Sequence, residues 1–244
     1  MKTLATLMAL IALGIAGCTA SAEPPHTNHT YVVWADITRS ITPGDLTRWH
    51  EVMERKLIPQ VACGDRLVIL PIQKDSTAAA PLLDWQTSAL DGEPTRSELL
   101  ACRKAQAELK RQVATTFDSL IAAKPVAGWT DILGTLDRLD SLGSQKLTQS
   151  TVIAVYLSDM QQASPELNMN KLKLTNEKIG PTVGQVVTKH EKALQAWKGV
   201  IVRCWLNPAG PNVAPPLNGQ RQLKTFYEEL FRQVGGSLDE FQPL

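Results

Sequence analysis

Three short segments, far apart along the chain, carry oxygen-bearing side chains that could together hold one divalent cation. The segments lie at 36–40, around residue 130 and at 158–159. Their two carboxylates and three hydroxyl groups belong to Asp36, Thr38, Ser40, Thr130 and Asp159. Hard oxygen donors of this kind suit Mg²⁺, Mn²⁺ or Ca²⁺ much better than zinc. The sequence therefore predicts a hard-cation site if the three segments converge.

The elements predicted around these segments would bring them to one edge of a sheet. Residues 31–35 and 150–158 form nearly continuous apolar runs, typical of strands buried on both faces. Asp36 and Asp159 each directly follow one of these runs. Strands that alternate with helices favour a parallel sheet, and such sheets bind ligands beyond the carboxyl ends of their strands. Both carboxylates are therefore expected at the same edge.

The remaining pattern predicts an α/β fold of the doubly wound type, with a mostly parallel central sheet and helices on both faces. We predict strands at 31–35, 66–72, 81–85, 150–158 and 200–206, the third of them at the edge of the sheet. We predict helices at 43–57, 95–123, 131–142, 183–197 and 220–234. The polar stretch 161–180 is expected to be a long loop, and loops of this length in compact domains often carry function.

The N-terminal residues predict a destination in the cell envelope. Residues 1–17 have one Lys before a short apolar run, which is typical of a secretory signal and too short to span a bilayer. The end of this run resembles the lipobox of bacterial lipoproteins, which implies that Cys18 is acylated. The alternative is an ordinary secretory signal with a chance Cys. Residues 18–29 would form a tether. By the same resemblance, Thr19 after the Cys implies the outer rather than the inner membrane, with the protein facing the periplasm.

Composition limits the classes of partner and indicates the redox state of the cysteines. The remaining chain of about 227 residues suffices for one domain, predicted at 30–244. The net charge is +1 without a Lys/Arg tract, which argues against nucleic acid as a partner. Besides Cys18 the chain has three cysteines, so an oxidising periplasm predicts one disulfide and one free thiol. His26 and His29 could contact a metal, but in a tether they are expected to be solvated.

The ordered set of site residues resembles the metal-ion-dependent adhesion site of von Willebrand factor A domains, which have the integrin I-domain fold. That family has Asp-x-Ser-x-Ser after the first strand, a Thr in a later loop and an Asp after the fourth strand. Asp36, Thr38 and Ser40 match the first element, with Thr38 in place of a Ser. Thr130 matches the second element and Asp159 the third.

The resemblance implies a division of labour at the site. Thr38 and Ser40 would bind the metal directly, Thr130 directly or through water, and the two carboxylates mainly through water. One coordination position would remain free for an Asp or Glu of a protein partner. The alternative for Asp36 is a helix N-cap, and Asp131 is expected to cap its own helix. The family usually has Gly where Met160 stands, so this turn would have to form without glycine's conformational freedom.

The same resemblance implies a disulfide, whereas the places of the two tryptophans follow from the predicted strand and loop that hold them. In this fold Cys63 would precede the second strand, at the edge opposite the metal. An antiparallel third strand would return Cys102 to that edge, which predicts a Cys63–Cys102 disulfide and a buried, reduced Cys204. Trp34 is expected in the core. Trp129 in the loop could either anchor a partner or pack in the core.

Function is predicted to be partner binding in the cell envelope through Mg²⁺, or Mn²⁺ or Ca²⁺, with a membrane contact through the lipid anchor. The alternative is a structural scaffold subunit of an envelope assembly with a vestigial or purely structural metal site. A hydrolase is disfavoured because the chain has no Ser-His-Asp order or nucleophile elbow. His50 and His190 lie in predicted helices far from the strand ends. We therefore predict that the protein is not an enzyme.

Overall fold

The computed structural model describes residues 28–90, 92–123, 128–142, 150–207 and 218–244, which build a six-stranded sheet in the order β3-β2-β1-β4-β5-β6. The parallel strands are β1 (His29–Asp36), β2 (Arg66–Ile72), β4 (Thr151–Ser158), β5 (Ile201–Leu206) and β6 (Ser237–Pro243). At the edge, β3 (Leu83–Gln86) pairs antiparallel with β2. The predicted α/β fold, with its mostly parallel sheet and one antiparallel edge strand, is confirmed.

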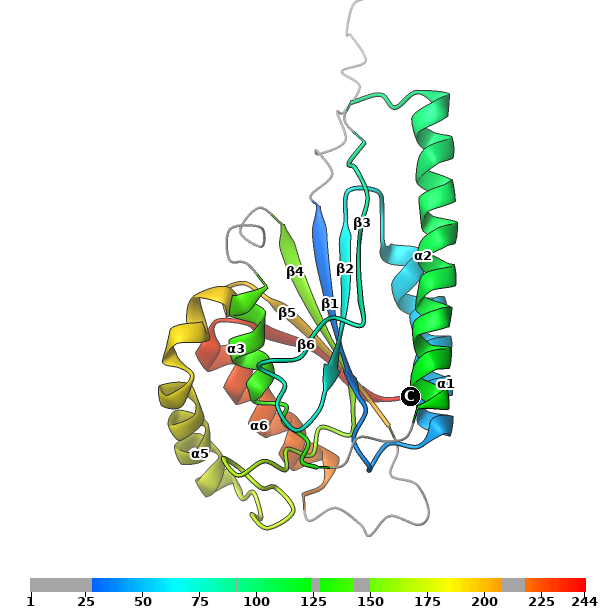
Figure 1. Cartoon of the computed structure of the whole chain (residues 1–244). Helices are drawn as coiled ribbons and strands as arrows, with labels where there is room; N and C mark the ends of the chain where they lie inside the picture. Colours follow the sequence, from blue (N-terminus) through cyan, green and yellow to red (C-terminus); the bar gives the residue numbers. More distant parts are fainter. Residues whose placement is uncertain (1–27, 91, 124–127, 143–149, 208–217) are drawn as a thin grey trace, which may run out of the picture.

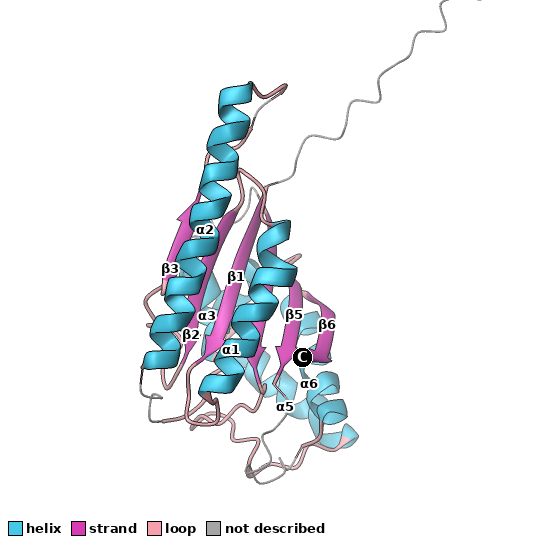
Figure 2. Cartoon of the chain, turned by 90° about the vertical axis from the view of Figure 1, so that its right-hand side faces the viewer, coloured by secondary structure: helices cyan, strands magenta, loops and turns pink. Residues whose placement is uncertain are grey.

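Helices cover both faces of this sheet (Figure 1, Figure 2). One face carries α1 (Pro43–Val52) and α2 (Arg96–Ala122), and the other carries α3 (Gly134–Ser141), α5 (Asn176–Lys189) and α6 (Gln220–Val234). Strand β1 shows why this arrangement forms, because its residues alternate between two cores. Val33 lies in the core under α1 and α2, whereas Val32 and the fully buried Trp34 lie in the core under the other helices. A strand without polar alternation can be stable only when both of its faces are covered.

The helix predicted at 183–197 and one strand differ most from the predictions. The helix predicted at 183–197 is α5 from Asn176, followed after His190 by a 3₁₀ segment at Glu191–Trp197. Pro181 lies inside α5 near its beginning, where a missing N–H removes only one backbone hydrogen bond. The long loop predicted at 161–180 is correspondingly shorter. Strand β6 was missed because its sequence, Ser-Leu-Asp-Glu-Phe-Gln-Pro, reads as polar and ends in proline.

The remaining helices follow the predictions with local corrections. Helix α1 ends at Val52, and a π-helical turn and a 3₁₀ turn complete the segment to Gln60. Helix α3 begins at Gly134, three residues later than predicted. Helix α2 begins with a capping box of Thr95 and Glu98. Its first turns project beyond the sheet at the end where β1 begins (Figure 1).

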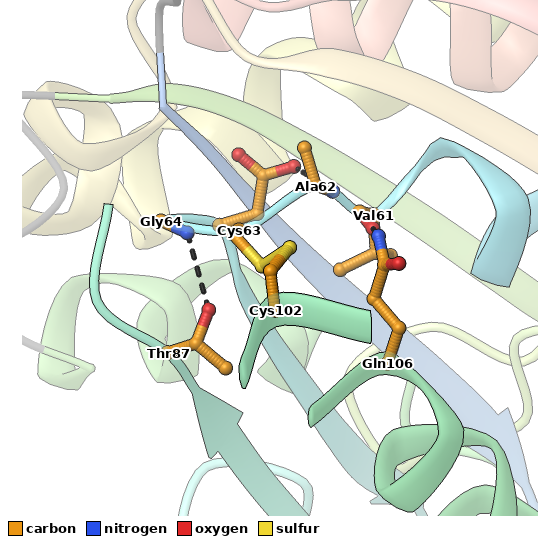
Figure 3. Close-up of a disulfide and its surroundings, with 8 residues drawn as sticks. Val61, Ala62, Cys63, Gly64, Thr87, Cys102 and Gln106 are labelled. Carbon is orange, nitrogen blue, oxygen red and sulfur yellow. Dashed lines mark hydrogen bonds between the residues drawn. A yellow bond between two sulfur atoms is a disulfide. The ribbon is translucent and has the colours of Figure 1, made fainter. Parts of the chain in front are cut away.

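A disulfide joins that projecting end of α2 to the loop before β2, as predicted (Figure 3). Cys63 and Cys102 are bonded, with their Cα atoms 5.9 Å apart. Hydrogen bonds from Gly64 N–H to the Thr87 hydroxyl and from the Gln106 amide to the Val61 carbonyl hold the surrounding loop (Figure 3). Cys204 is buried and unpaired, as also predicted. The disulfide lies at the edge of the sheet opposite the carboxyl ends of the parallel strands.

The predicted signal segment 1–17, the acylated Cys18 and His26 lie outside the described residues. His29 begins β1, and its backbone N–H donates to the Asp65 carboxylate at 2.8 Å. His29 therefore belongs to the folded domain rather than to a solvated tether. Among the described residues, no helix combines the length and apolar character needed to cross a bilayer.

Candidate metal centre

The predicted site residues meet where the strand order changes direction. Strand β1 lies at the centre of the sheet, with β2 on one side and β4 on the other. The chain continues from β1 to β2 and from β4 to β5, so the connections leave these two neighbouring strands in opposite directions. Ligands of open α/β sheets bind at such a switch point, beyond the carboxyl ends of the strands. Asp36 ends β1, and Asp159 directly follows β4.

Asp36 is fully buried and accepts three hydrogen bonds. Its Oδ1 accepts from the Thr38 backbone N–H at 2.9 Å and from the Thr38 hydroxyl at 2.7 Å. Its Oδ2 accepts from the Ser158 hydroxyl at 2.8 Å, which ties the end of β1 to the end of β4. The alternative role of Asp36 as a helix cap is wrong for α1, since Thr42 caps that helix in a capping box with Asp45.

The Thr38 hydroxyl joins the first segment to the loop of Thr130, while Asp36 joins the first segment to Ser158. The Thr38 Oγ1 lies 3.2 Å from the Ser40 hydroxyl and 3.0 Å from the Thr130 hydroxyl. Thr38 and Thr130 are buried, whereas Ser40 is exposed. The cluster is therefore closed toward the protein and open to solvent on the side of Ser40.

Asp159 completes the cluster and carries a perturbed carboxyl group. Burial, and then the negative charge of Asp36, raise the pKa of Asp159 to about 7, although hydrogen bonds from the Gln161 N–H and the Ser40 hydroxyl oppose the shift. Burial also raises the pKa of Asp36, against its hydrogen bonds from Thr38 and Ser158. Two carboxyl groups thus lie in one partly closed cluster, and none of the five site residues carries a positive charge. A bound divalent cation would favour the ionised form of both.

These donors fit a hard cation and do not fit zinc. All five side chains offer oxygen only, which is the chemistry that Mg²⁺, Mn²⁺ and Ca²⁺ select. Within the described part of the chain there is no group of three or more His, Cys, Asp or Glu residues that could hold a metal by themselves. Hydroxyl groups must therefore contribute to any cation site here.

The turn after Asp159 adopts a left-handed conformation despite the absence of glycine. Met160 has a φ of 58°, which costs about 1–2 kcal/mol for a residue with a side chain. Contacts offset this cost: the Met160 side chain is fully buried, its N–H donates to Ser158 Oγ at 3.0 Å, and its carbonyl accepts from the Tyr227 hydroxyl at 3.1 Å. The turn therefore forms through packing and hydrogen bonding.

Asp131 stands beside the cluster in a structural role. Its Oδ1 accepts from the Gly134 N–H at 3.1 Å, in the first turn leading into α3, as expected for a capping residue. Its Oδ2 accepts from the Ser76 N–H at 3.3 Å, so it also ties the loop after β2 to the loop of Thr130. Both carboxylate oxygens therefore have structural partners.

Trp129 is exposed at the same edge, with 43% of its surface accessible. The alternative that it packs in the core is wrong. Its neighbour Gly128 has a φ of 142°, and a Cβ there would lie 3.1 Å from the Lys74 Cβ, so the Lys74 side chain covers this glycine. The loop thus presents a large aromatic side chain to solvent next to the oxygen cluster.

Two residues that build the site are absent from the expected donor set. Ser158 belongs to the third segment, where it ends an apolar strand, and its hydroxyl donates to Asp36. Gln162 is fully buried, and its side chain contacts the segment after Thr130. Nothing in its sequence context distinguishes it from the neighbouring Gln161.

Neither a protein-family model nor a curated protein matches the chain. Two solved structures share its general architecture at low identity. Manganese-loaded TRAP protein from Plasmodium vivax superposes with a TM-score of 0.41 and 11% identity, over 88% of this chain and 69% of that chain. The pilus adhesin SpaC from Lactobacillus rhamnosus GG, in an open conformation, superposes with a TM-score of 0.45 and 5% identity, over 90% of this chain and 28% of that chain. Likenesses this distant carry no argument about function, which therefore depends on the site itself.

Proposed function

We propose that this protein is a binding module of the von Willebrand factor A type that captures a protein partner in the cell envelope through a divalent metal. The observation that carries the proposal is the convergence of two carboxylates with raised pKa and three hydroxyl groups at one switch point. The metal would be Mg²⁺, with Mn²⁺ or Ca²⁺ as substitutes of the same oxygen-seeking class.

Each residue of the cluster has a distinct task in this proposal. Thr38, Ser40 and Thr130 would hold the metal through their hydroxyl groups, and Asp36 and Asp159 would balance its charge, mainly through water. When bound, the metal offers one exchangeable position to a carboxylate oxygen of the partner. The protein keeps Asp36 in place through Thr38 and Ser158, and leaves the exposed Ser40 side open for the partner.

Trp129 would supply the second contact with the partner. Aromatic residues beside a polar interaction often dominate binding, because they bury a large area at a small cost in conformational entropy. A partner of this module would therefore present an Asp or Glu next to an apolar surface. The alternative, a scaffold subunit with a vestigial metal site, would not require Trp129 or the hydroxyl cluster for binding. We do not propose an enzymatic activity.

The proposed location is the outer membrane, facing the periplasm, with the chain anchored through acylated Cys18. Two or more acyl chains give stable anchoring, because each buried methylene contributes about 0.8 kcal/mol. Replacing Cys18 with Ala should move the protein from the membrane fraction to the soluble envelope fraction. Retention in the membrane fraction after this change would contradict the lipid anchor.

The function is tested by capture from an envelope extract on the immobilised mature protein. We expect Mg²⁺-dependent capture that EDTA abolishes and that Thr130→Ala reduces at least tenfold. Trp129→Ala should weaken capture at least fivefold while the affinity for Mn²⁺ stays the same. Amidation of carboxyl groups in the extract should also prevent capture. Ser119→Ala, which removes an exposed hydroxyl on α2, is the control. Capture that is identical in EDTA and in the Thr130→Ala variant would favour the scaffold alternative.

A further inference from the structure

We propose that Gln162 is a positioning residue that joins the two later segments of the metal centre and sets Thr130 relative to Asp159. This inference rests on the proposed metal site and names a residue that controls its geometry. Gln162 follows Asp159 by three positions in the chain, and its side chain reaches the residues just after Thr130. No other described side chain hydrogen-bonds both of the N–H groups that open the α3 segment.

Both the oxygen and the nitrogen of the Gln162 side-chain amide are hydrogen-bonded. Its Oε1 accepts from the Ile132 N–H at 2.6 Å and from the Leu133 N–H at 3.0 Å. Its Nε2 donates to the Ser164 hydroxyl at 2.7 Å. Because a buried amide is costly without hydrogen bonds, a fully buried Gln with both ends bonded is held in one conformation.

The hydrogen bonds of Gln162 fix the segment that directly follows Thr130. The first N–H groups of a helix need external acceptors, and Leu133, at the cap of α3, provides no side-chain hydrogen bond. Gln162 supplies an acceptor to this segment from about 30 residues along the chain. Next to it, the Ala163 N–H donates to the Thr130 carbonyl at 2.9 Å. The backbone of Thr130 is thus fixed directly by the segment that begins at Asp159.

A second tie between the same two segments lies farther from the metal centre and provides a matched comparison. His190 is buried, and its ring nitrogens lie 2.9 Å from the Asp137 carboxylate and 3.0 Å from the Glu166 carboxylate. Asp137 belongs to α3 and Glu166 to the loop after Asp159. If the role of Gln162 were only to stabilise the fold, loss of the His190 tie should have similar consequences.

The test compares Gln162→Met and Gln162→Asn with Gln162→Glu and His190→Asn in the full mature protein. Met cannot accept these hydrogen bonds, and Asn is too short by one methylene, whereas Glu keeps an acceptor oxygen at the same reach. Mn²⁺ affinity is measured by titration calorimetry. Amide hydrogen exchange of Ile132 and Leu133 is measured without metal.

We expect Gln162→Met and Gln162→Asn to weaken Mn²⁺ binding at least tenfold and to accelerate exchange at Ile132 and Leu133 at least tenfold. Gln162→Glu and His190→Asn should keep the Mn²⁺ affinity within threefold of the wild type. If only one of the Met and Asn variants folds, that variant decides. Equal affinity and exchange in a folded Met or Asn variant would overturn the inference, as would an equal loss of affinity in His190→Asn. If the wild type itself binds no Mn²⁺, the proposed metal site fails. The exchange result still shows whether the Gln162 side chain fixes the segment at Ile132 and Leu133.

Discussion

Replacing Asp159 with Asn should abolish Mg²⁺ and Mn²⁺ binding and should make the metal-free protein more stable at pH 8. The pKa of Asp159 is raised to about 7 by burial and by the charge of Asp36. The folded chain therefore holds this proton more tightly than the unfolded chain does. Stability is highest below the ordinary pKa of Asp, near 4, and falls as the pH rises toward 7. Since one pKa unit corresponds to about 1.4 kcal/mol, the loss is about 4 kcal/mol at most.

The measurement is the unfolding temperature of the wild type and of Asp159→Asn at pH 5 and pH 8, in EDTA and in Mg²⁺. In EDTA, the unfolding temperature of the variant relative to that of the wild type should rise between pH 5 and pH 8, because the variant lacks the carboxyl group whose ionisation is unfavourable. In Mg²⁺, the wild type should regain stability at pH 8 through binding to the native state, and the variant should not. Asp118→Asn makes the same charge change on the exposed face of α2 and serves as the control.

Two results would contradict this account of the site. If the unfolding temperatures of the wild type and the variant in EDTA differ by the same amount at both pH values, ionisation of Asp159 is not disfavoured by its surroundings. Unchanged Mg²⁺ stabilisation in the variant would show that the cation binds elsewhere. The comparison between variant and wild type is needed because His190 also has a raised pKa, through its contacts with Glu166 and Asp137. Its contribution falls with rising pH in both proteins and cancels in the difference.

The position of the cluster could be predicted because it follows from strand ends. Continuous apolar runs predict strands buried on both faces, and the polar residue that ends each run must lie at the edge of the sheet. The apolar runs alone therefore place Asp36 and Asp159 at the edge where the structure has them. Thr130 is a candidate by its hydroxyl group, but its position at the same edge follows only from the family resemblance, since its loop has no periodicity of its own.

The supporting contacts could not be predicted, because they depend on side chains that meet across loops. Gln162 and Gln161 are adjacent and identical in type, yet the Gln162 side chain accepts the hydrogen bonds from the segment leading into α3. The backbone conformation of Met160 could not be predicted from the sequence either. Its left-handed conformation is stabilised by its buried side chain and the Tyr227 hydroxyl, which no local preference indicates. Strand β6 pairs at the edge of the sheet, where burial is partial and the sequence signal is weak.

Removing the disulfide should destabilise the domain strongly without changing the metal centre. Cys63 and Cys102 are 39 positions apart, and closing a loop of this length restricts the unfolded chain by an amount worth about 4 kcal/mol in the chain-entropy treatment. The link holds the beginning of α2, because Cys102 lies in the first two turns of this helix, whereas the buried residues of the helix begin at Leu109. The carboxyl ends of β1 and β4 lie at the other edge.

We therefore expect the double variant Cys63→Ala/Cys102→Ala to lose about 3–4 kcal/mol of unfolding free energy, measured by urea denaturation under non-reducing conditions. Its Mn²⁺ affinity should stay within twofold of the wild type, because the disulfide and the site residues lie at opposite edges of the sheet. Cys204→Ala removes a buried thiol without removing a cross-link and controls for the loss of sulfur. Dithiothreitol should destabilise the wild type by a similar amount and leave the double variant unchanged. A tenfold loss of Mn²⁺ affinity in the double variant would instead mean that the two ends of the sheet are coupled, and that the metal centre is not positioned by its local contacts alone.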